Sequence, residues 1–251
     1  MKGRIVATII IGFAIAICLQ GCKGDAGPAG PAGPIGRLSG NLYGRVSLYD
    51  EDSTRITNNS GVTISVASVN SAQSTREGWW TLYGLSAGTY TVVFSKPGYG
   101  TFKYFGLEFV GGDSLYFGST SLVNIPRYYF NSFTASFGAD SVLNMSGTIS
   151  SHVPHNGYRN VMIFVDTTAT VSSTRYVATF AIYVWSDSVF SYNETRSDLI
   201  TYYGIPGGSR LWLVAYGSSG SYFGYYDPTL RRNVFPSLSL TPSSVVDVLL
   251  P

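Results

Sequence analysis

The sequence predicts an all-β protein with two β-sandwich domains. Charged residues make up 12% of the chain and aromatic residues 15%, a balance that suits small antiparallel sheets better than helices with charged surfaces. Apolar and polar residues alternate between glycines over residues 42–122, and short apolar runs return over residues 127–251. We therefore expect almost no helix and a domain boundary near Pro126.

Residues 1–21 have the pattern of a removable leader. Lys2 and Arg4 precede an apolar run over residues 5–19, which is too short to span a bilayer comfortably. The run ends in Leu-Gln-Gly-Cys, and this sequence resembles the lipobox of bacterial lipoproteins. The resemblance implies cleavage before Cys22 and acylation of that cysteine. The alternative is a plain signal peptide or an uncleaved anchor in which Cys22 is incidental.

The cysteine count and the charge balance agree with a lipid anchor. Only Cys18 and Cys22 are present, so cleavage leaves Cys22 without a partner for an internal disulfide. Several acyl chains on one residue give a stable anchor. Loss of Lys2 and Arg4 reduces the 16 basic residues to 14, equal to the 14 acidic ones, which disfavours nucleic acid as a partner. Because Lys23 rather than aspartate follows the cysteine, we expect an outer-membrane lipoprotein of the cell envelope.

The segment 22–39 is expected to be a tether. Glycine stands at every third position over residues 24–36, with mostly proline and alanine between, a period that resembles collagen. Four triplets are too few for a stable triple helix on their own. A semi-extended stalk is the simpler interpretation. In polyproline II geometry it could hold the first domain up to about 50 Å from the membrane.

The first domain is expected over residues 40–126. Alternation predicts that residues 90–94 form a strand with one buried face, packed against a strand over residues 62–66. The order of glycines and apolar residues resembles the carboxypeptidase regulatory-like domain, as seen in Gly44-Arg45-Val46, Gly61-Val62-Thr63-Ile64, Gly78-Trp79-Trp80, Gly88-Thr89-Tyr90 and Lys96-Pro97-Gly98-Tyr99. The resemblance implies a seven-stranded sandwich of transthyretin-like or immunoglobulin-like type with no catalytic residues. One departure is that Ser74-Thr75-Arg76-Glu77, not Thr-Asp, precedes Gly78.

Two adjacent tryptophans in this domain must differ in exposure if they lie on one strand. Side chains alternate between the faces of a strand, so Trp79 and Trp80 point in opposite directions. We expect Trp80 in the core and Trp79 on the surface or at an interface.

A second immunoglobulin-like sandwich is expected over residues 127–251. The expected strands cover residues 142–149, 160–165, 176–185, 211–216 and 245–250, separated by glycines and by Pro206.

The sequence offers little for catalysis or for a metal. It has no Gly-x-Ser-x-Gly elbow, phosphate loop or pair of zinc-type cysteines. His152 and His155 could share a metal, but no third ligand lies nearby in the sequence. The run 50–52 of three acidic residues lacks the spacing of a calcium loop. We therefore expect no metal, no cofactor and no enzyme activity.

One candidate ligand-binding surface is an aromatic loop of the second domain. Its residues are Tyr202, Tyr203, Tyr222, Phe223, Tyr225, Tyr226 and Asp227. Exposed aromatic rings can stack on sugar rings while hydroxyls and an acid make polar contacts. The alternative is that these rings pack on their own sandwich, as tyrosine often does in all-β domains.

Five of the ten aspartates are followed by Ser or Thr and then by an aliphatic residue or Thr. This pattern resembles an acceptor motif for periplasmic O-glycosylation, which implies modification at Ser53, Ser114, Ser141, Thr167 and Ser188. The alternative is that these are ordinary turn pairs, whose aspartates bond the backbone two residues on.

The sequence therefore predicts a non-catalytic envelope lipoprotein with a structural, accessory or binding role. Its expected partners are the membrane, through Cys22, and a glycan or another envelope protein. A carbohydrate-binding lipoprotein that uses the aromatic loop is the alternative.

Overall fold

The protein is all-β, as predicted. The computed structural model describes residues 38–66, 70–150, 158–185, 188–219 and 224–251, and almost all regular structure in these ranges is strand. Residues 22–37 of the expected tether, including Cys22, lie outside the described residues, as do His152, His155, Tyr222 and Phe223, whereas Ser39 is the first residue of a strand. In the described ranges, no helix is both long enough and apolar enough to cross a membrane.

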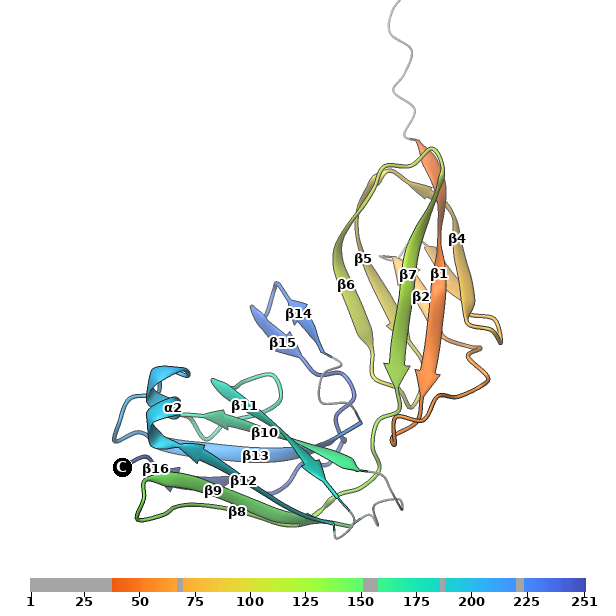
Figure 1. The fold of residues 1–251 in the computed structure, drawn as a ribbon. Coiled ribbons are helices and arrows are strands. Elements are labelled where there is room, and N and C mark those ends of the chain that lie inside the picture. The colour runs from red at the N-terminus through yellow and green to blue at the C-terminus, as the bar shows by residue number, and fades with distance from the viewer. Residues whose placement is uncertain (1–37, 67–69, 151–157, 186–187, 220–223) are drawn as a thin grey trace, which may run out of the picture. The chain divides into compact units, whose positions relative to one another are not determined.

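The first sandwich contains seven strands in two sheets (Figure 1). One sheet has the order β4-β1-β7, with β4 over Trp79–Ser86, β1 over Ser39–Tyr49 and β7 over Ser114–Val123. The other has the order β3-β2-β5-β6, over Asn70–Gln73, Thr63–Val66, Gly88–Ser95 and Phe102–Phe109. All pairs are antiparallel except β1 with β7, which run parallel.

The core of this sandwich comes from the alternating apolar positions that the sequence indicated. Ile64 pairs with Phe94 and Val66 with Val92, and all four side chains are fully buried. Trp80 is 3% exposed and meets Phe94 edge-on at 5.6 Å between ring centroids. Trp79, one residue earlier, is 46% exposed. The predicted division between the two tryptophans is confirmed.

The second group of strands forms another sandwich. One sheet has the order β11-β10-β13-β16, with bounds Ala178–Val184, Arg159–Asp166, Arg210–Ser218 and Val246–Leu249. The facing sheet has the order β12-β9-β8, over Val189–Thr195, Val142–Ile149 and Phe130–Phe137. A short helix, α2 over Arg196–Thr201, follows β12, and a hairpin joins β14 (Tyr225–Asp227) to β15 (Arg232–Val234).

Each sandwich has its own hydrophobic core. One buried cluster draws only on residues between Leu42 and Leu122, and the largest other cluster only on residues between Tyr128 and Leu250. The boundary near Pro126 lies between these two sets and remains a prediction for independent folding.

Candidate functional site

The predicted aromatic loop is divided between two places. Tyr202 is the C-cap of α2 and is 79% exposed, whereas Tyr203 packs edge-on against Phe180 of the second core at 5.6 Å. Tyr225 instead contacts Phe102 and Phe105 of β6, with ring centroids 5.6 and 6.0 Å apart. Among the described residues, no ring contact joins the pair 202–203 to the pair 225–226.

The acidic member of that loop has a structural role. Asp227 is 7% exposed, and its Oδ1 accepts hydrogen bonds from the backbone N–H groups of Thr229 and Leu230 at 2.9 and 3.1 Å. It therefore holds the turn between β14 and β15 and has little surface to offer a ligand. Tyr226 remains 57% exposed beside it.

The acidic run 50–52 is also structural. Asp50 Oδ1 accepts hydrogen bonds from the N–H groups of Asp52 and Thr54, at 3.0 and 2.8 Å. Glu51 and Asp52 bind Arg159, and Glu51 also accepts from the N–H of Arg127 at 3.0 Å. In the part of the chain that the structure describes, no group of three His, Cys, Asp or Glu residues could hold a metal ion.

The Asp-Ser and Asp-Thr pairs lie at turns and strand ends. Ser53, Ser141 and Ser188 have φ of 61°, 61° and 58°, in the left-handed region, and the hydroxyl-bearing residues 53, 114 and 167 are exposed. Asp140 and Asp166 each accept from the N–H two residues on, at 3.3 and 2.9 Å. The turn interpretation thus accounts for these two aspartates, and glycosylation remains a separate question.

A different set of aromatic side chains gathers on one face of the first sandwich. Tyr43, Trp79, Tyr83 and Tyr116 are exposed by 36%, 46%, 72% and 49% on the sheet β4-β1-β7. The register places Tyr43 beside Tyr116 and Arg45 beside Trp79. We call this set of four residues the aromatic face.

Alternation in the strands produces the aromatic face. In β1, Leu42, Val46 and Leu48 are buried, so the intervening Tyr43, Arg45 and Ser47 lie on the outer side. In β4 the same rule buries Trp80 and Leu82 and directs Trp79, Thr81 and Tyr83 outward. The parallel pairing of β1 with β7 then brings Tyr116 within 5.3 Å of Tyr43, measured between ring centroids.

Polar groups lie between these rings. Arg45 lies 5.7 Å from the Trp79 ring, and its Nε donates to the Glu77 carbonyl at 3.0 Å, so the guanidinium is held against the indole. Asn41 bonds Ser114 at 3.4 Å and accepts from the N–H of Gly84 at 3.2 Å. The aromatic face thus combines ring surfaces with fixed hydrogen-bonding groups.

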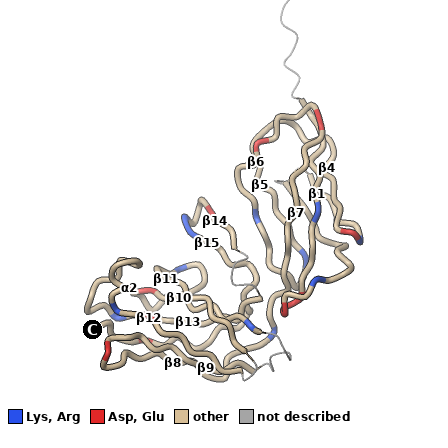
Figure 2. The backbone as a smooth tube through the Cα atoms, viewed as in Figure 1, with Lys and Arg blue, Asp and Glu red and all other residues tan. Residues whose placement is uncertain are grey.

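A smaller exposed cluster lies on the second sandwich. Tyr158 packs against Tyr183 and Trp185 at 5.0 and 5.5 Å, and Trp185 is 60% exposed. Tyr158 contacts both other rings, and this cluster has three exposed rings where the aromatic face has four. Figure 2 shows the charged residues of the described chain as scattered short segments, and Arg45 is the charged residue that lies against a ring of the aromatic face.

Comparison with known proteins finds no match to this chain among protein-family models or curated protein sequences. Among solved structures it is similar to a candidate carbohydrate-binding protein from Bacteroides uniformis, at 12% identity over 85% of this chain and 100% of that chain, with a TM-score of 0.33. A DUF3823 family protein from Bacteroides ovatus matches at 16% identity over 84% of this chain and 100% of that one, TM-score 0.33. A second DUF3823 family protein, from Parabacteroides merdae, matches at 12% identity over 84% of this chain and 99% of that chain, with a TM-score of 0.31. Similarity of this degree assigns neither a family nor a ligand.

Proposed function

We propose that this protein is a lipid-anchored, non-catalytic envelope protein that binds glycans through the aromatic face. The observation that carries the proposal is the exposure of Tyr43, Trp79, Tyr83 and Tyr116 on one side of a single sheet. Four large aromatic side chains on one face are a costly arrangement unless something covers them.

A glycan fits the chemistry of this face better than a purely apolar partner does. The C–H faces of sugar rings pack on aromatic rings, and their hydroxyls need hydrogen-bonding groups close by. Asn41, Arg45 and Thr81 supply such groups beside the rings. Arg45 restrains the Trp79 ring and Tyr43 contacts Tyr116, so these three rings lose less side-chain entropy on binding than free rings would.

A glycan array with the mature chain carrying Cys22→Ser tests the proposal. We expect binding that falls at least tenfold in Trp79→Ala and in Tyr83→Ala. The matched controls are Tyr202→Ala and Tyr226→Ala, which remove exposed rings of the second domain. If glycan binding is lost in these two controls and retained in Trp79→Ala and Tyr83→Ala, the binding site is the aromatic loop and not the aromatic face.

Self-association is the main competing use of this surface. Analytical ultracentrifugation of the same proteins addresses it. A dimer that Trp79→Ala dissociates, together with no signal on the array, would overturn the glycan proposal.

The proposed anchor and location rest on residues outside the described part of the chain. The lipobox supports acylation of Cys22, and Lys23 supports the outer membrane as the destination. Metabolic labelling with an alkynyl fatty acid tests the anchor, with Cys22→Ser as the variant expected to lose the label and to remain unprocessed. Equal labelling of the variant would contradict it.

O-glycosylation of the Asp-Ser and Asp-Thr turns is a further part of the proposal. Exposure favours Ser53, Ser114 and Thr167 over Ser141 and Ser188, which are half-buried. Intact-mass spectrometry of protein from its native host, before and after mild base elimination, tests it. A mass equal to that of the lipidated polypeptide would exclude the modification.

A further inference from the structure

The two edge strands β6 and β7 follow one another in the chain but do not pair. Each is the last strand of its own sheet. At one end the two strands are connected by residues 110–113. At the other end they are joined by the β-bridge between Tyr99 and Asn124 and by a 3.1 Å hydrogen bond from the Gly100 N–H to the Val123 carbonyl. The described strands therefore leave an opening between β6 and β7 that is closed at both ends.

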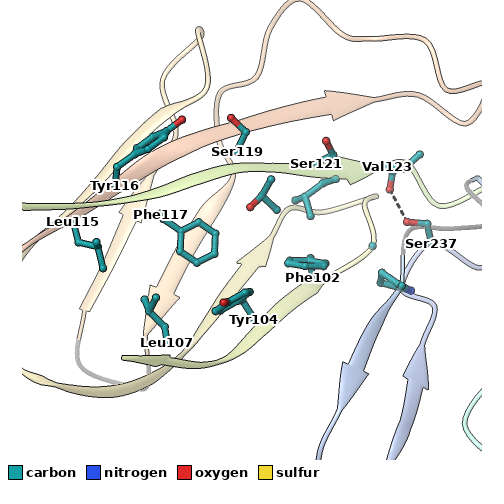
Figure 3. A pocket seen from close by; sticks show the side chains of 15 residues that line it. Phe102, Tyr104, Leu107, Leu115, Tyr116, Phe117, Ser119, Ser121, Val123 and Ser237 are labelled. Atoms are coloured by element: carbon teal, nitrogen blue, oxygen red, sulfur yellow. Dashed lines mark hydrogen bonds between the residues drawn. The ribbon is translucent and has the colours of Figure 1, made fainter. Parts of the chain in front are cut away.

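A cavity of about 540 Å³ occupies this opening, within the range of small-molecule sites (Figure 3). We call it the seam cavity. Its walls are inward-facing residues of the two strands, seen in Figure 3 on either side of the space: Phe102, Tyr104 and Leu107 from β6, and Leu115 and Phe117 from β7. Ser237 lies at the end where its Oγ donates to the Val123 carbonyl at 3.3 Å.

One extra residue in each edge strand shapes the seam cavity. In β6 the register against β5 shifts between Tyr104 and Leu107, and Gly106 has φ of 72°. In β7 the register against β1 shifts at Phe117, and Gly118 has φ of 107°. Bulges bend a strand and redirect its side chains. Here they direct Phe117 into the space between the sheets, where its ring centroid lies 5.2 Å from that of Tyr104 and 5.5 Å from that of Phe94.

The lining defines the chemistry of an occupant. No Lys, Arg, Asp or Glu lines the seam cavity, so a charged ligand would lose its hydration without gaining a partner. Aromatic and leucine side chains contribute to both walls, and the polar side chains in the lining are the uncharged Ser119, Thr120, Ser121 and Ser237. The ligand that fits is therefore uncharged and largely apolar, with rings that can pack on Tyr104 and Phe117.

One polar group in the wall lacks a partner. Thr120 faces inward beside Val46 in the register and is 8% exposed, and no hydrogen bond joins its hydroxyl to another described residue. Because Thr120 lines the seam cavity and its hydroxyl makes no bond within the described protein, this hydroxyl is free to bond an occupant. The Ser121 backbone adds a second polar element. Residues two apart on a strand direct their N–H and C=O groups to the same side, and the Val123 carbonyl points toward Gly100. The N–H and C=O groups of Ser121 therefore point to that same side, toward the opening.

We propose that the seam cavity is a binding site for an uncharged, ring-containing small molecule with one hydrogen-bonding group that meets the Thr120 hydroxyl. This site lies between two sheet edges, whereas the aromatic face covers the outer side of one sheet. Tyr116 borders both sites, whereas Trp79 and Tyr83 do not line the seam cavity. Variants at Trp79 and Tyr83 therefore test the aromatic face separately, and either proposal can fail alone.

The test uses N-phenyl-1-naphthylamine, an uncharged probe with two ring systems and one N–H, whose fluorescence rises in apolar sites. We expect saturable binding of one probe per chain to the mature protein carrying Cys22→Ser. Thr120→Val keeps the volume and removes the hydroxyl, and should weaken binding about fivefold, the value of one neutral hydrogen bond.

Filling the seam cavity provides the second variant. Leu115 is 37% exposed at the cavity wall, so Leu115→Trp should fill the space and weaken binding at least tenfold. Leu240→Trp, at a position that is 86% exposed, is the matched control and should bind as the parent does. Thermal unfolding checks that each variant is folded. If Leu115→Trp does not fold, the effect of Thr120→Val on probe binding decides whether the proposal holds.

Two outcomes would overturn the proposal. One is the absence of saturable binding to the parent protein. The other is binding that neither folded variant changes. Tyr83→Ala, which alters the aromatic face, should leave probe binding unchanged while it lowers glycan binding, so the two sites are tested separately.

Discussion

The guanidinium of Arg159 lies 2.6 Å from the Oδ1 atom of Asp52. This ion pair connects the start of β10 to the turn that follows β1. Arg159 also lies 3.2 Å from Glu51 and 5.4 Å from the ring of Tyr128, and it is only 5% exposed. A buried guanidinium without these partners would be strongly unfavourable.

Replacing this arginine should destabilise the protein. Glu51 and Asp52 keep 27% and 33% of their side-chain surface exposed, so water can partly replace the lost cation. We therefore expect Arg159→Met to lower the free energy of unfolding by about 1 to 2 kcal/mol. Urea unfolding measures this. Arg210→Met is the control, because the Arg210–Asp247 pair is exposed and worth less than about 1 kcal/mol.

The adjacent tryptophans should differ strongly in their contribution to stability. Trp80→Ala leaves a cavity beside Phe94 and Phe117 and should cost about 3 to 5 kcal/mol. Trp79→Ala removes an exposed ring and should cost much less. Chemical denaturation of both variants checks this difference, and equal losses would contradict the assignment of Trp80 to the core.

Alkaline pH should destabilise the protein through tyrosines whose pKa is raised in the folded state. Burial and the neighbouring Glu194 raise the pKa of Tyr192 to about 12, and burial raises the pKa of Tyr128. A tyrosine in the unfolded chain ionises near pH 10, so between about pH 10 and 12 the unfolded state releases protons that the folded state retains. The free energy of unfolding should therefore fall as pH rises through this window.

Denaturation at several pH values measures this slope. Tyr192→Phe should make it shallower, because the phenol that resists ionisation is gone. Tyr202→Phe, at a site that is 79% exposed, serves as the control and should retain the parent slope. A parent slope of zero between pH 10 and 11.5 would contradict the expectation.

Glycine should be tolerated better than serine at the serine positions whose backbone is in the left-handed region. Ser141 has φ of 61°, a conformation that costs an L-residue about 1 to 2 kcal/mol and glycine almost nothing. Ser141→Gly should keep or raise the midpoint of thermal unfolding, whereas Ser141→Val should lower it. Ser136→Val, in β8, is the comparison because its backbone is extended. A Ser141→Val protein as stable as the parent would show that the turn is not strained.

Alternation predicted much of the first sandwich because its strands bury one face, whereas β10 of the second sandwich is buried on both faces and was predicted from its apolar run. The pattern at Val62, Ile64 and Val66 needed no tertiary information, and the expected strand over residues 142–149 matches β9. The strands β8 and β12 gave a weaker signal, since serine, threonine and asparagine occupy many of their positions. The helix α2 depends on a local cap, in which Thr195 accepts from the N–H of Asp198.

The candidate sites were harder to predict because they depend on pairing between distant strands. The sequence indicated that Trp79 is exposed, but only the parallel pairing of β1 with β7 places Tyr43 beside Tyr116. Clustering in sequence had instead suggested Tyr225, whose ring is covered by contacts with β6 that no local pattern reveals. The bulges that form the seam cavity are likewise a property of paired strands.

The parallel pairing of β1 with β7 also determines how the first sandwich would carry mechanical load. β1 begins at Ser39, directly after the tether, and β7 ends at Val123, where the chain leaves for the second sandwich. Tension between these two points pulls the strands lengthwise in opposite directions, so the rungs from Asn41–Ser114 to Tyr49–Val123 are strained together in shear. Antiparallel terminal strands pulled at neighbouring ends would instead separate one rung at a time. A protein held by its N-terminal end and pulled through its second domain would therefore yield only when the whole ladder ruptures at once.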